Sequence, residues 1–323
     1  QTFKLNIAAP PAFRHVSRMP RKQRIQYPGA VYHIISRGNY RKELFLKENT
    51  GAAFERALME AVERCGWKLH AYVIMSNHYH LAVETPEPNL VDGMKWLQST
   101  FATRFNRLRN ERGHVFQGRY KSILIGEERP LLGLIDYIHL NPVRAGICPL
   151  ETLREYKLSS YPKYFKRTPV DGLCRDDFLG MLELPSSLAG MNRYAKHLEL
   201  SDAKDSKRKA ALAKQYCRGW FIGSKEEKKA LAKDMAEKHP DVDWEGADLQ
   251  ALNEAQWESI VCAQMRRLKQ DEASLLTTPK GAAWKIEIAR LLRKQTTAKN
   301  GWIAKRLNMG HPTRVSNLIQ NKA

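Results

Sequence analysis

Two histidines carry the first chemical signal in the chain. His78 and His80 lie in HYHLAVE, a run whose alternation of polar and apolar residues predicts a strand. Alternate side chains of a strand lie on one face, so both imidazoles point the same way and Tyr79 points to the other face. Two imidazoles at this spacing can bind one divalent cation. A histidine pair on a strand also has a purely structural interpretation, and that is the commoner case.

A phenol and an amide form the second signal, in the segment LIDYIHLNPVRAG. Tyr137 and Asn141 are four residues apart, which places them on one face of a predicted helix that Pro130 opens and Pro142 closes. Structural roles remain open for both, because an asparagine at a helix end often serves as a stop signal and a tyrosine often packs in a core.

Together the four side chains suit phosphodiester cleavage. A cation held by His78, His80 and the Asn141 amide oxygen would polarise a scissile phosphate. Tyr137 would attack phosphorus in line, forming a phosphotyrosine link while a 3′-OH leaves. A phenol has a pKa of about 10, so nearby positive charge must stabilise the phenolate. The covalent intermediate keeps the phosphodiester energy, so rejoining requires no nucleotide cofactor.

The surrounding elements must bring these segments together. Helices are predicted from Thr50, from Met94 to Leu108 and from Pro130, and strands for residues 31–36, 69–75, 78–84 and 120–125. The resulting order, β-α-β-β-α-β-α, is that of a ferredoxin-like antiparallel sheet covered by helices. We therefore expect an α+β fold, followed by α-helical C-terminal regions.

The charge of the chain indicates a polyanionic partner, most often nucleic acid. The 323 residues include 54 Lys and Arg against 34 Asp and Glu, a net charge of +20. Cations are interleaved with Phe116 and Tyr120 between residues 104 and 121, a pattern that suits single-stranded DNA, although a solvated helix face is the alternative. We expect phosphate or base contacts from this group and from two arginines beside the proposed centre: Arg37, Arg104, Arg107, Arg119, Lys121 and Arg144.

Other classes of protein fit the composition poorly. The five cysteines are widely spaced and contain no CxxC, which argues against a disulfide framework or a zinc ribbon and fits a reducing cytoplasm. No apolar run approaches the ~18 residues of a membrane span, and the N-terminal segment lacks the apolar core of a signal peptide. We expect a cytoplasmic protein with no membrane partner.

The C-terminal residues 281–323 predict a helix-turn-helix unit. They carry nine basic residues and one acid, and helices are expected around 286–292, around 302–307 and from Pro312 onward. The start of the last helix would face the DNA major groove, where Arg314 and Asn317 could bind base edges. A three-helix domain that binds nothing is the alternative. The expected division of the chain is a basic arm at 1–26, a catalytic domain at 27–166, a helical middle region at 167–280 and this unit at 281–323.

Five segments resemble the HUH-type single-tyrosine transposases, and among them the REP-associated tyrosine transposases. The resemblance covers roughly residues 25–165, and YCRGWFIGSKEE and the C-terminal unit also resemble longer members. It implies an HUH endonuclease fold with Tyr137 as nucleophile, His78 and His80 as the metal-binding pair and Asn141 as the third ligand. It also implies Mg²⁺ or Mn²⁺ and single-stranded hairpin DNA. The segments are YHIISRGN (32–39), MSNHYHLAVET (75–85), FQGRYKS (116–122), YIHLNPVRAG (137–146) and LSSY (158–161).

The expected function is therefore a metal-dependent transposase. It would cut and rejoin single-stranded DNA at palindromic hairpins through a 5′-phosphotyrosine intermediate, as a monomer or a homodimer. A domesticated regulator that binds hairpins without cutting is the alternative, and the intact His78, His80 and Tyr137 favour the enzyme. An RNA-recognition module would need exposed aromatics at the centres of two strands, which VYHIIS and HLAVE lack.

Overall fold

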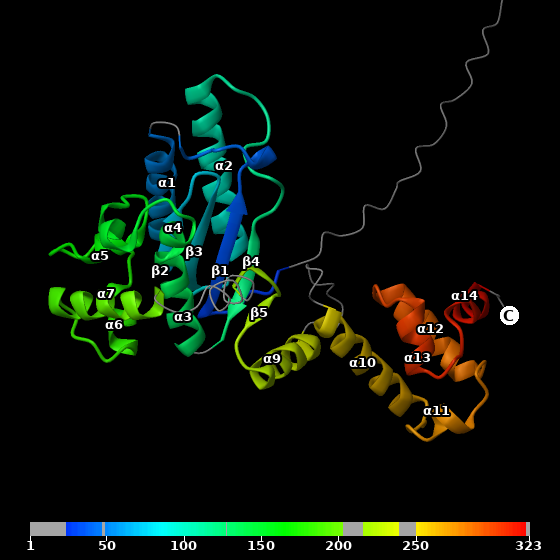
Figure 1. The fold of residues 1–323 in the computed structure, drawn as a ribbon. Coiled ribbons are helices and arrows are strands. Elements are labelled where there is room, and N and C mark those ends of the chain that lie inside the picture. The colour runs from blue at the N-terminus through cyan, green and yellow to red at the C-terminus, as the bar shows by residue number, and fades with distance from the viewer. Residues whose placement is uncertain (1–23, 47–48, 127, 203–215, 239–249, 321–323) are drawn as a thin grey trace, which may run out of the picture.

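A computed structural model describes residues 24–46, 49–126, 128–202, 216–238 and 250–320 (Figure 1). The expected basic arm, 1–26, lies almost entirely outside the described residues. Among the described helices, none combines the length and the apolar character needed to cross a membrane.

A five-stranded sheet organises the first part of the chain, in the order β2-β3-β1-β4-β5. The first four of these pair in antiparallel fashion, which confirms the predicted ferredoxin-like arrangement. β5 adds to the β4 edge in parallel, so the sheet is mixed and not wholly antiparallel. The strands are β1 (Ala30–Arg37), β2 (Lys68–Ile74), β3 (His78–Thr85), β4 (Lys121–Ile125) and β5 (Phe221–Ile222).

Helices pack on both faces of this sheet. On one face Phe54 stacks on Tyr79 with ring centroids 4.5 Å apart and meets Phe101 edge-on. On the other face a third helix packs against β2 and β3, and its Tyr137 meets His80. The alternation of β3 thus separates an apolar face from a face that carries the histidines. The helices are α1 (Thr50–Cys65), α2 (Leu90–Arg109) and α3 (Glu128–His139), with a 3-10 turn, η1 (Asn39–Arg41), after β1.

The first helix follows its local sequence closely. Its apolar stripe, which includes Phe54, Leu58 and Val62, is buried. Gly66 ends the helix in the left-handed conformation at a φ of 65°, which glycine adopts without steric cost. Thr50 is the first helical residue, as predicted, and Asn49 occupies the capping position.

The third helix ends earlier than predicted. α3 stops at His139, and a short helix, α4 (Asn141–Arg144), follows with Pro142 in its first turn, where a missing N–H costs nothing. The N–H of Leu140 donates to the Asp136 carbonyl and the N–H of Arg144 to the Leu140 carbonyl, so the helical path is almost continuous. Asn141 therefore still follows Tyr137 by about one turn.

The first hydrophobic core extends beyond residue 166, where the catalytic domain was expected to end. Buried residues of this core run from Ile25 to Met235, and Trp220 and Ile222 are among them. Part of the expected middle region therefore packs with the sheet. The added elements are η2 (Leu150–Glu155), α5 (Ser160–Tyr164), α6 (Arg175–Met181), α7 (Leu188–Asp202) and α9 (Lys225–Lys238).

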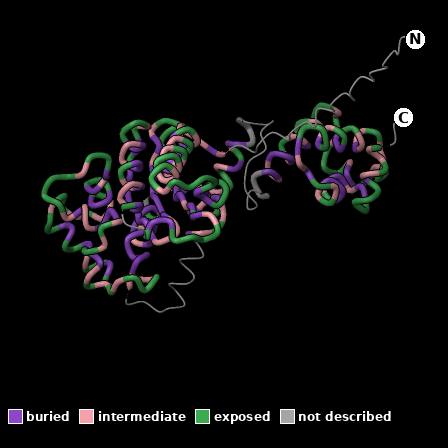
Figure 2. Tube along the Cα trace, turned by 90° about the horizontal axis from the view of Figure 1, so that it is seen from above, coloured by how far each residue is buried: buried purple, intermediate pink, exposed green. Residues whose placement is uncertain are grey.

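A second core gathers the C-terminal helices, and Figure 2 shows buried residues inside both parts of the chain. The three helices expected in 281–323 are confirmed, with Val315 buried and Leu318 packed on the same core. Trp257 and Leu275 complete the core, so it begins well before residue 281. Its helices are α10 (Gln250–Arg267), α11 (Ser274–Thr277), α12 (Ala283–Gln295), α13 (Asn300–Arg306) and α14 (Pro312–Gln320).

Candidate active site

The histidine pair lies at the start of β3, facing α3. The ring centroids of His78 and His80 are 5.1 Å apart. The Nδ1 of His78 donates to the Asn77 Oδ1 at 2.7 Å, and the Nδ1 of His80 is 2.9 Å from the Nε2 of His33. No described residue forms a hydrogen bond with the Nε2 of either ligand candidate. Each ring is therefore held through one nitrogen and keeps the other for a ligand.

α3 brings the phenol to this pair. The ring centroid of Tyr137 is 5.6 Å from that of His80 and 5.9 Å from that of His33. The Arg144 guanidinium lies 5.5 Å from the centre of the same phenol ring. Asn141 is buried one turn after Tyr137. The structure thus brings together the four residues predicted to form the centre: His78, His80, Tyr137 and Asn141.

The phenol is held in its protonated form. Burial is the main reason that the pKa of Tyr137 is raised, and the neighbouring Cys217 raises it further. The Asn141 side chain and the positive charge of Arg144 act on the same pKa in the opposite direction. Tyr137 is only 6% exposed, so any reaction of this phenol would require both deprotonation and access.

The imidazoles are held neutral. Burial lowers the pKa of His78 to about 4, and the charge of Arg37 contributes. Burial also lowers the pKa of His80 far below its usual value, with further contributions from His33, His78 and Arg37. A neutral imidazole offers a lone pair, which is the form that binds a cation.

Three residues at the centre were not predicted from the sequence. The Nδ1 of His33 donates to the backbone carbonyl of Tyr216 at 2.8 Å, the Tyr216 ring stacks on Tyr137 at 5.1 Å, and the Cys217 Sγ lies 3.2 Å from the phenol oxygen. Alternation in VYHIIS could have placed His33 on the face opposite Tyr32. Residues 216–217 were noted only through the resemblance of YCRGWFIGSKEE to longer family members, which assigned them no place in the site.

The segment that carries Tyr216 and Cys217 is fastened along β4. The N–H of Leu124 donates to the Trp220 carbonyl and that of Gly126 to the Ile222 carbonyl, both within normal hydrogen-bond length. The Nζ of Lys121 donates to the Cys217 carbonyl at 2.9 Å. Lys121, expected to contact DNA, therefore serves in this structure to hold the segment over the site.

Arg144 offers hydrogen-bond donors beside the phenol. Its Nε and Nη1 are buried and meet no acceptor within the described part of the chain. Burial also lowers its pKa. Buried, unsatisfied donors of a guanidinium are costly to maintain, and they are suited to an anionic ligand that would satisfy them.

The other expected DNA contacts lie in different settings. Arg37 is exposed and lies opposite His78 in the sheet register, and Arg107 and Arg119 are exposed as well. Arg104 is engaged by Glu60 of α1 through two hydrogen bonds of 2.8 Å. In the C-terminal unit, both base-reading candidates, Arg314 and Asn317, are exposed on α14.

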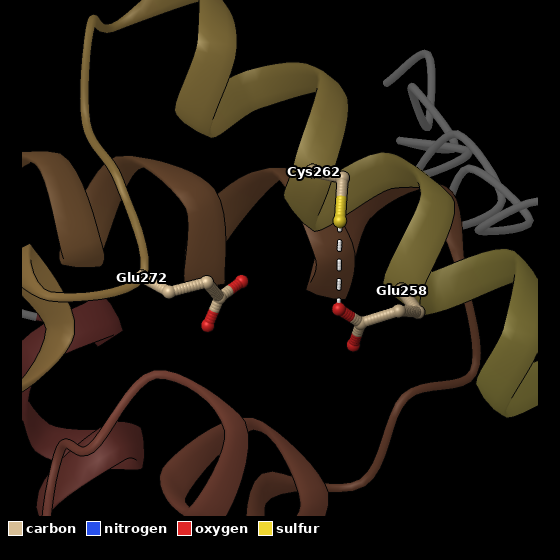
Figure 3. Close-up of side chains that lie close together, drawn as sticks. All are labelled: Glu258, Cys262 and Glu272. Carbon is tan, nitrogen blue, oxygen red and sulfur yellow. Dashed lines mark hydrogen bonds between the residues drawn. The ribbon is translucent and has the colours of Figure 1, made fainter.

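An acidic cluster on α10 and in the residues just before α11 also has the side-chain types of a cation site. Figure 3 shows Glu258, Cys262 and Glu272 close together, with the Cys262 thiol donating to Glu258 at 3.5 Å. The Arg306 guanidinium already binds both carboxylates, with contacts of 2.6 Å to each. The cluster is therefore a structural ion-pair network that joins α10, the start of the α11 segment and α13.

Comparisons with known proteins confirm the motif resemblance to REP-associated tyrosine transposases. Residues 26–141 match the family described as Transposase IS200 like. A Haemophilus influenzae protein named as a REP-associated tyrosine transposase is 25% identical over 124 residues, which are 35% of this chain and 69% of the relative.

Two solved structures are similar as well. One is a REP-associated tyrosine transposase bound to a REP hairpin, at 16% identity and a TM-score of 0.39, covering 48% of this chain and 90% of that chain. The other is a transposase from Deinococcus radiodurans, at 20% identity and a TM-score of 0.27, covering 39% of this chain and 92% of that chain. The family match ends at Asn141, so Arg144, Tyr216 and Cys217 lie outside it.

Proposed function

We propose that this chain cuts and rejoins single-stranded DNA through a covalent link to Tyr137, because residues 26–141 match the family described as Transposase IS200 like. The observation that carries the proposal is the position of the phenol, between His80 and the unsatisfied donors of Arg144. A phenol, two imidazoles and a guanidinium thus lie close together, as the proposed reaction requires.

The donor set suits a divalent cation, Mg²⁺ or Mn²⁺. His78 and His80 are neutral and each has its Nε2 left over. The Asn141 side chain acts on the Tyr137 phenol beside them, so its amide oxygen would complete the set as a neutral ligand. When bound by these three residues, the cation supplies positive charge that polarises the scissile phosphate.

The chain's own residues account for the remaining chemistry. As the phenol loses its proton, the Tyr137 oxygen forms a bond to phosphorus, the bond from phosphorus to the 3′ oxygen breaks, and the 3′-OH leaves with a proton. Arg144 stabilises the charge that develops on the phosphoryl oxygens, since its free N–H groups require no rearrangement to bind them. The 5′-phosphotyrosine keeps the bond energy, so a second 3′-OH can reverse the step.

The substrate we propose is a DNA hairpin with a single-stranded flank, as in repetitive extragenic palindromes. The motif resemblance and the name of the Haemophilus influenzae relative support this choice. The net charge of +20 suits a nucleic-acid partner. Exposed Arg37, Arg107 and Arg119 would contact phosphates of the strand, and exposed Arg314 and Asn317 would contact bases of a second DNA segment.

A covalent adduct is the decisive measurement. The full-length chain is incubated with an end-labelled hairpin oligonucleotide and Mn²⁺, and the adduct is scored on a denaturing gel. We expect an adduct with the wild type and none with Tyr137→Phe, which still binds the hairpin because only a hydroxyl is lost. Tyr120→Phe is the matched control, since Tyr120 packs under Arg24 and should not react. An adduct formed by Tyr137→Phe would place the nucleophile elsewhere.

The cation ligands are tested in the same assay. His78→Ala and His80→Ala should abolish the adduct and leave hairpin affinity nearly intact, because phosphate contacts dominate affinity. Asn141→Ala should be milder, since water can replace a neutral amide. A wild-type chain that binds the hairpin tightly but never forms an adduct would instead support a non-cleaving regulator, for which the covered phenol of Tyr137 is the structural argument.

A further inference from the structure

The Tyr216 carbonyl, His33 and His80 form a hydrogen-bonded chain that runs into the active site. The Nδ1 of His33 is 2.8 Å from the Tyr216 carbonyl oxygen, and the Nε2 of His33 is 2.9 Å from the Nδ1 of His80. The rings of the two histidines stack at 5.1 Å. His33 is fully buried and His80 is 3% exposed, so water does not compete for these contacts.

The direction of every hydrogen bond in this chain follows from its first member. A carbonyl oxygen only accepts, so the Nδ1 of His33 carries a hydrogen. A neutral imidazole has a single N–H, so the Nε2 of His33 is an acceptor. The Nδ1 of His80 must therefore donate to it, which leaves the Nε2 of His80 as a lone pair. Both rings are buried and neither forms an ion pair with a described carboxylate, so both are neutral.

We propose that His33 is a positioning residue, which holds His80 in the Nδ1–H tautomer and so keeps the Nε2 lone pair of His80 available for a divalent cation. The inference rests on the proposed function only for the identity of the ligand. A free imidazole prefers the opposite tautomer, with the hydrogen on Nε2, so the arrangement requires a partner such as His33. Outer partners of this kind orient a ligating histidine and raise its basicity.

The same series of hydrogen bonds gives a role to residue 216, which lies 183 residues after His33. The backbone carbonyl of Tyr216, not its side chain, sets the tautomer of His33. A different side chain at position 216 would therefore still support these hydrogen bonds. Asn77 acts similarly on the other ligand. Its Nδ2 donates to the Arg41 carbonyl, which turns the Asn77 Oδ1 toward the Nδ1 of His78, so that His78 also keeps its Nε2 lone pair.

The tautomer is measurable without activity. Long-range ¹H–¹⁵N spectra of the ¹⁵N-labelled full chain, without added metal, distinguish a protonated from an unprotonated ring nitrogen. We expect the wild-type His80, assigned by its loss in His80→Gln, to carry its hydrogen on Nδ1. In His33→Phe, which fills the space without an acceptor, we expect the Nε2–H form to appear. His33→Gln, whose amide oxygen can accept, should restore much of the Nδ1–H form.

Cation affinity is the second readout. Mn²⁺ binding followed by electron paramagnetic resonance should weaken about 10- to 100-fold in His33→Phe and recover partly in His33→Gln. The buried His139, held by Tyr194 and Ser160, is the internal control, and its signals should not change. Wild-type His80 with its hydrogen on Nε2, or unchanged Mn²⁺ affinity in a folded His33→Phe, overturns the proposal. The expected tautomer in a chain that never cleaves DNA would leave it standing and refute only the proposed function.

Discussion

The phenol oxygen of Tyr137 lies 3.2 Å from the Sγ of Cys217, eighty residues further along the chain. This contact raises the pKa of Tyr137 beyond the effect of burial, so it opposes formation of the phenolate that the proposed reaction requires. Tyr216, the residue before Cys217, stacks on the same ring. The segment thus covers the Tyr137 phenol and raises its pKa.

Cys217→Ala should therefore increase cleavage. Without the thiol, the pKa of Tyr137 falls, and the rising limb of the pH–rate profile should move to lower pH. At neutral pH, below that limb, we expect a rate a few-fold above wild type. The measurement is the single-turnover cleavage rate from pH 6 to pH 10. Cys148→Ala, a half-buried cysteine of the same core, is the matched control. A profile of Cys217→Ala that coincides with wild type would show that the thiol has no influence on the reactive phenol.

Arg144→Gln should reduce the chemical step far more than binding. Removing one donor from a preorganised anion site typically costs about 10²- to 10³-fold in rate. We expect kcat to fall by about that factor while KM changes by a few-fold at most. Arg107→Gln, at an exposed site on α2, should show the opposite pattern, a higher KM with kcat retained. If Arg144→Gln raised only KM, Arg144 would be a binding residue without a role in the transition state.

Local patterns were sufficient to predict four of the residues that lie together at the candidate site. The strict alternation around Tyr79 placed His78 and His80 together, and the spacing of four between Tyr137 and Asn141 held even though α3 ends at His139. Both features depend only on neighbouring residues. The order of strands and helices along the chain was predicted from local patterns of the same kind.

Tyr216 and Cys217 reach the site from a distant part of the chain. β5 is two residues long and forms because the β4 edge accepts it, and Cys217 reaches Tyr137 only through that docking. Lys285 is a similar case, as one of the nine basic residues counted in 281–323. Its side chain is fully buried, and its Nζ donates to the carbonyls of Leu275 and Thr278. No periodicity in the sequence distinguishes this lysine from an exposed one.

The buried His139 should make the free energy of unfolding depend on pH in the acid range. Burial lowers its pKa to about 3, against 6.5 for an ordinary histidine. Between these values the unfolded chain binds a proton that the folded chain does not, so the free energy of unfolding falls as the pH is lowered from about 6.5 toward 3. One such histidine contributes a slope of about 1.4 kcal/mol per pH unit.

His139→Gln tests this dependence, because an amide can still reach Tyr194 and Ser160. Urea denaturation at several pH values should show a shallower slope for the variant between pH 4 and pH 6, by about one proton's worth. Above pH 7 the slopes of variant and wild type should agree, which serves as the control. Equal slopes below pH 6 would mean that His139 is protonated within the folded chain.

Substitutions of Arg314 distinguish base recognition from phosphate contact in the C-terminal unit. It is exposed at the start of α14, while Val315 beside it is buried in the second core, so α14 has one face free for DNA. If the guanidinium binds a guanine edge, Arg314→Ala should lose about 1–3 kcal/mol of preference for the specific hairpin over a scrambled one. Arg314→Lys should lose it too, because lysine lacks the planar fork.

If Arg314 touches only phosphate, Arg314→Lys should bind as wild type, and Arg314→Ala should weaken both DNAs equally and reduce the salt slope by about 0.9. Salt titrations of the three full-length proteins on both hairpins separate these outcomes. Wild-type affinity and slope for Arg314→Ala on both hairpins would show that this face of α14 does not contact DNA, and that its positive charge serves only as a hydrated surface.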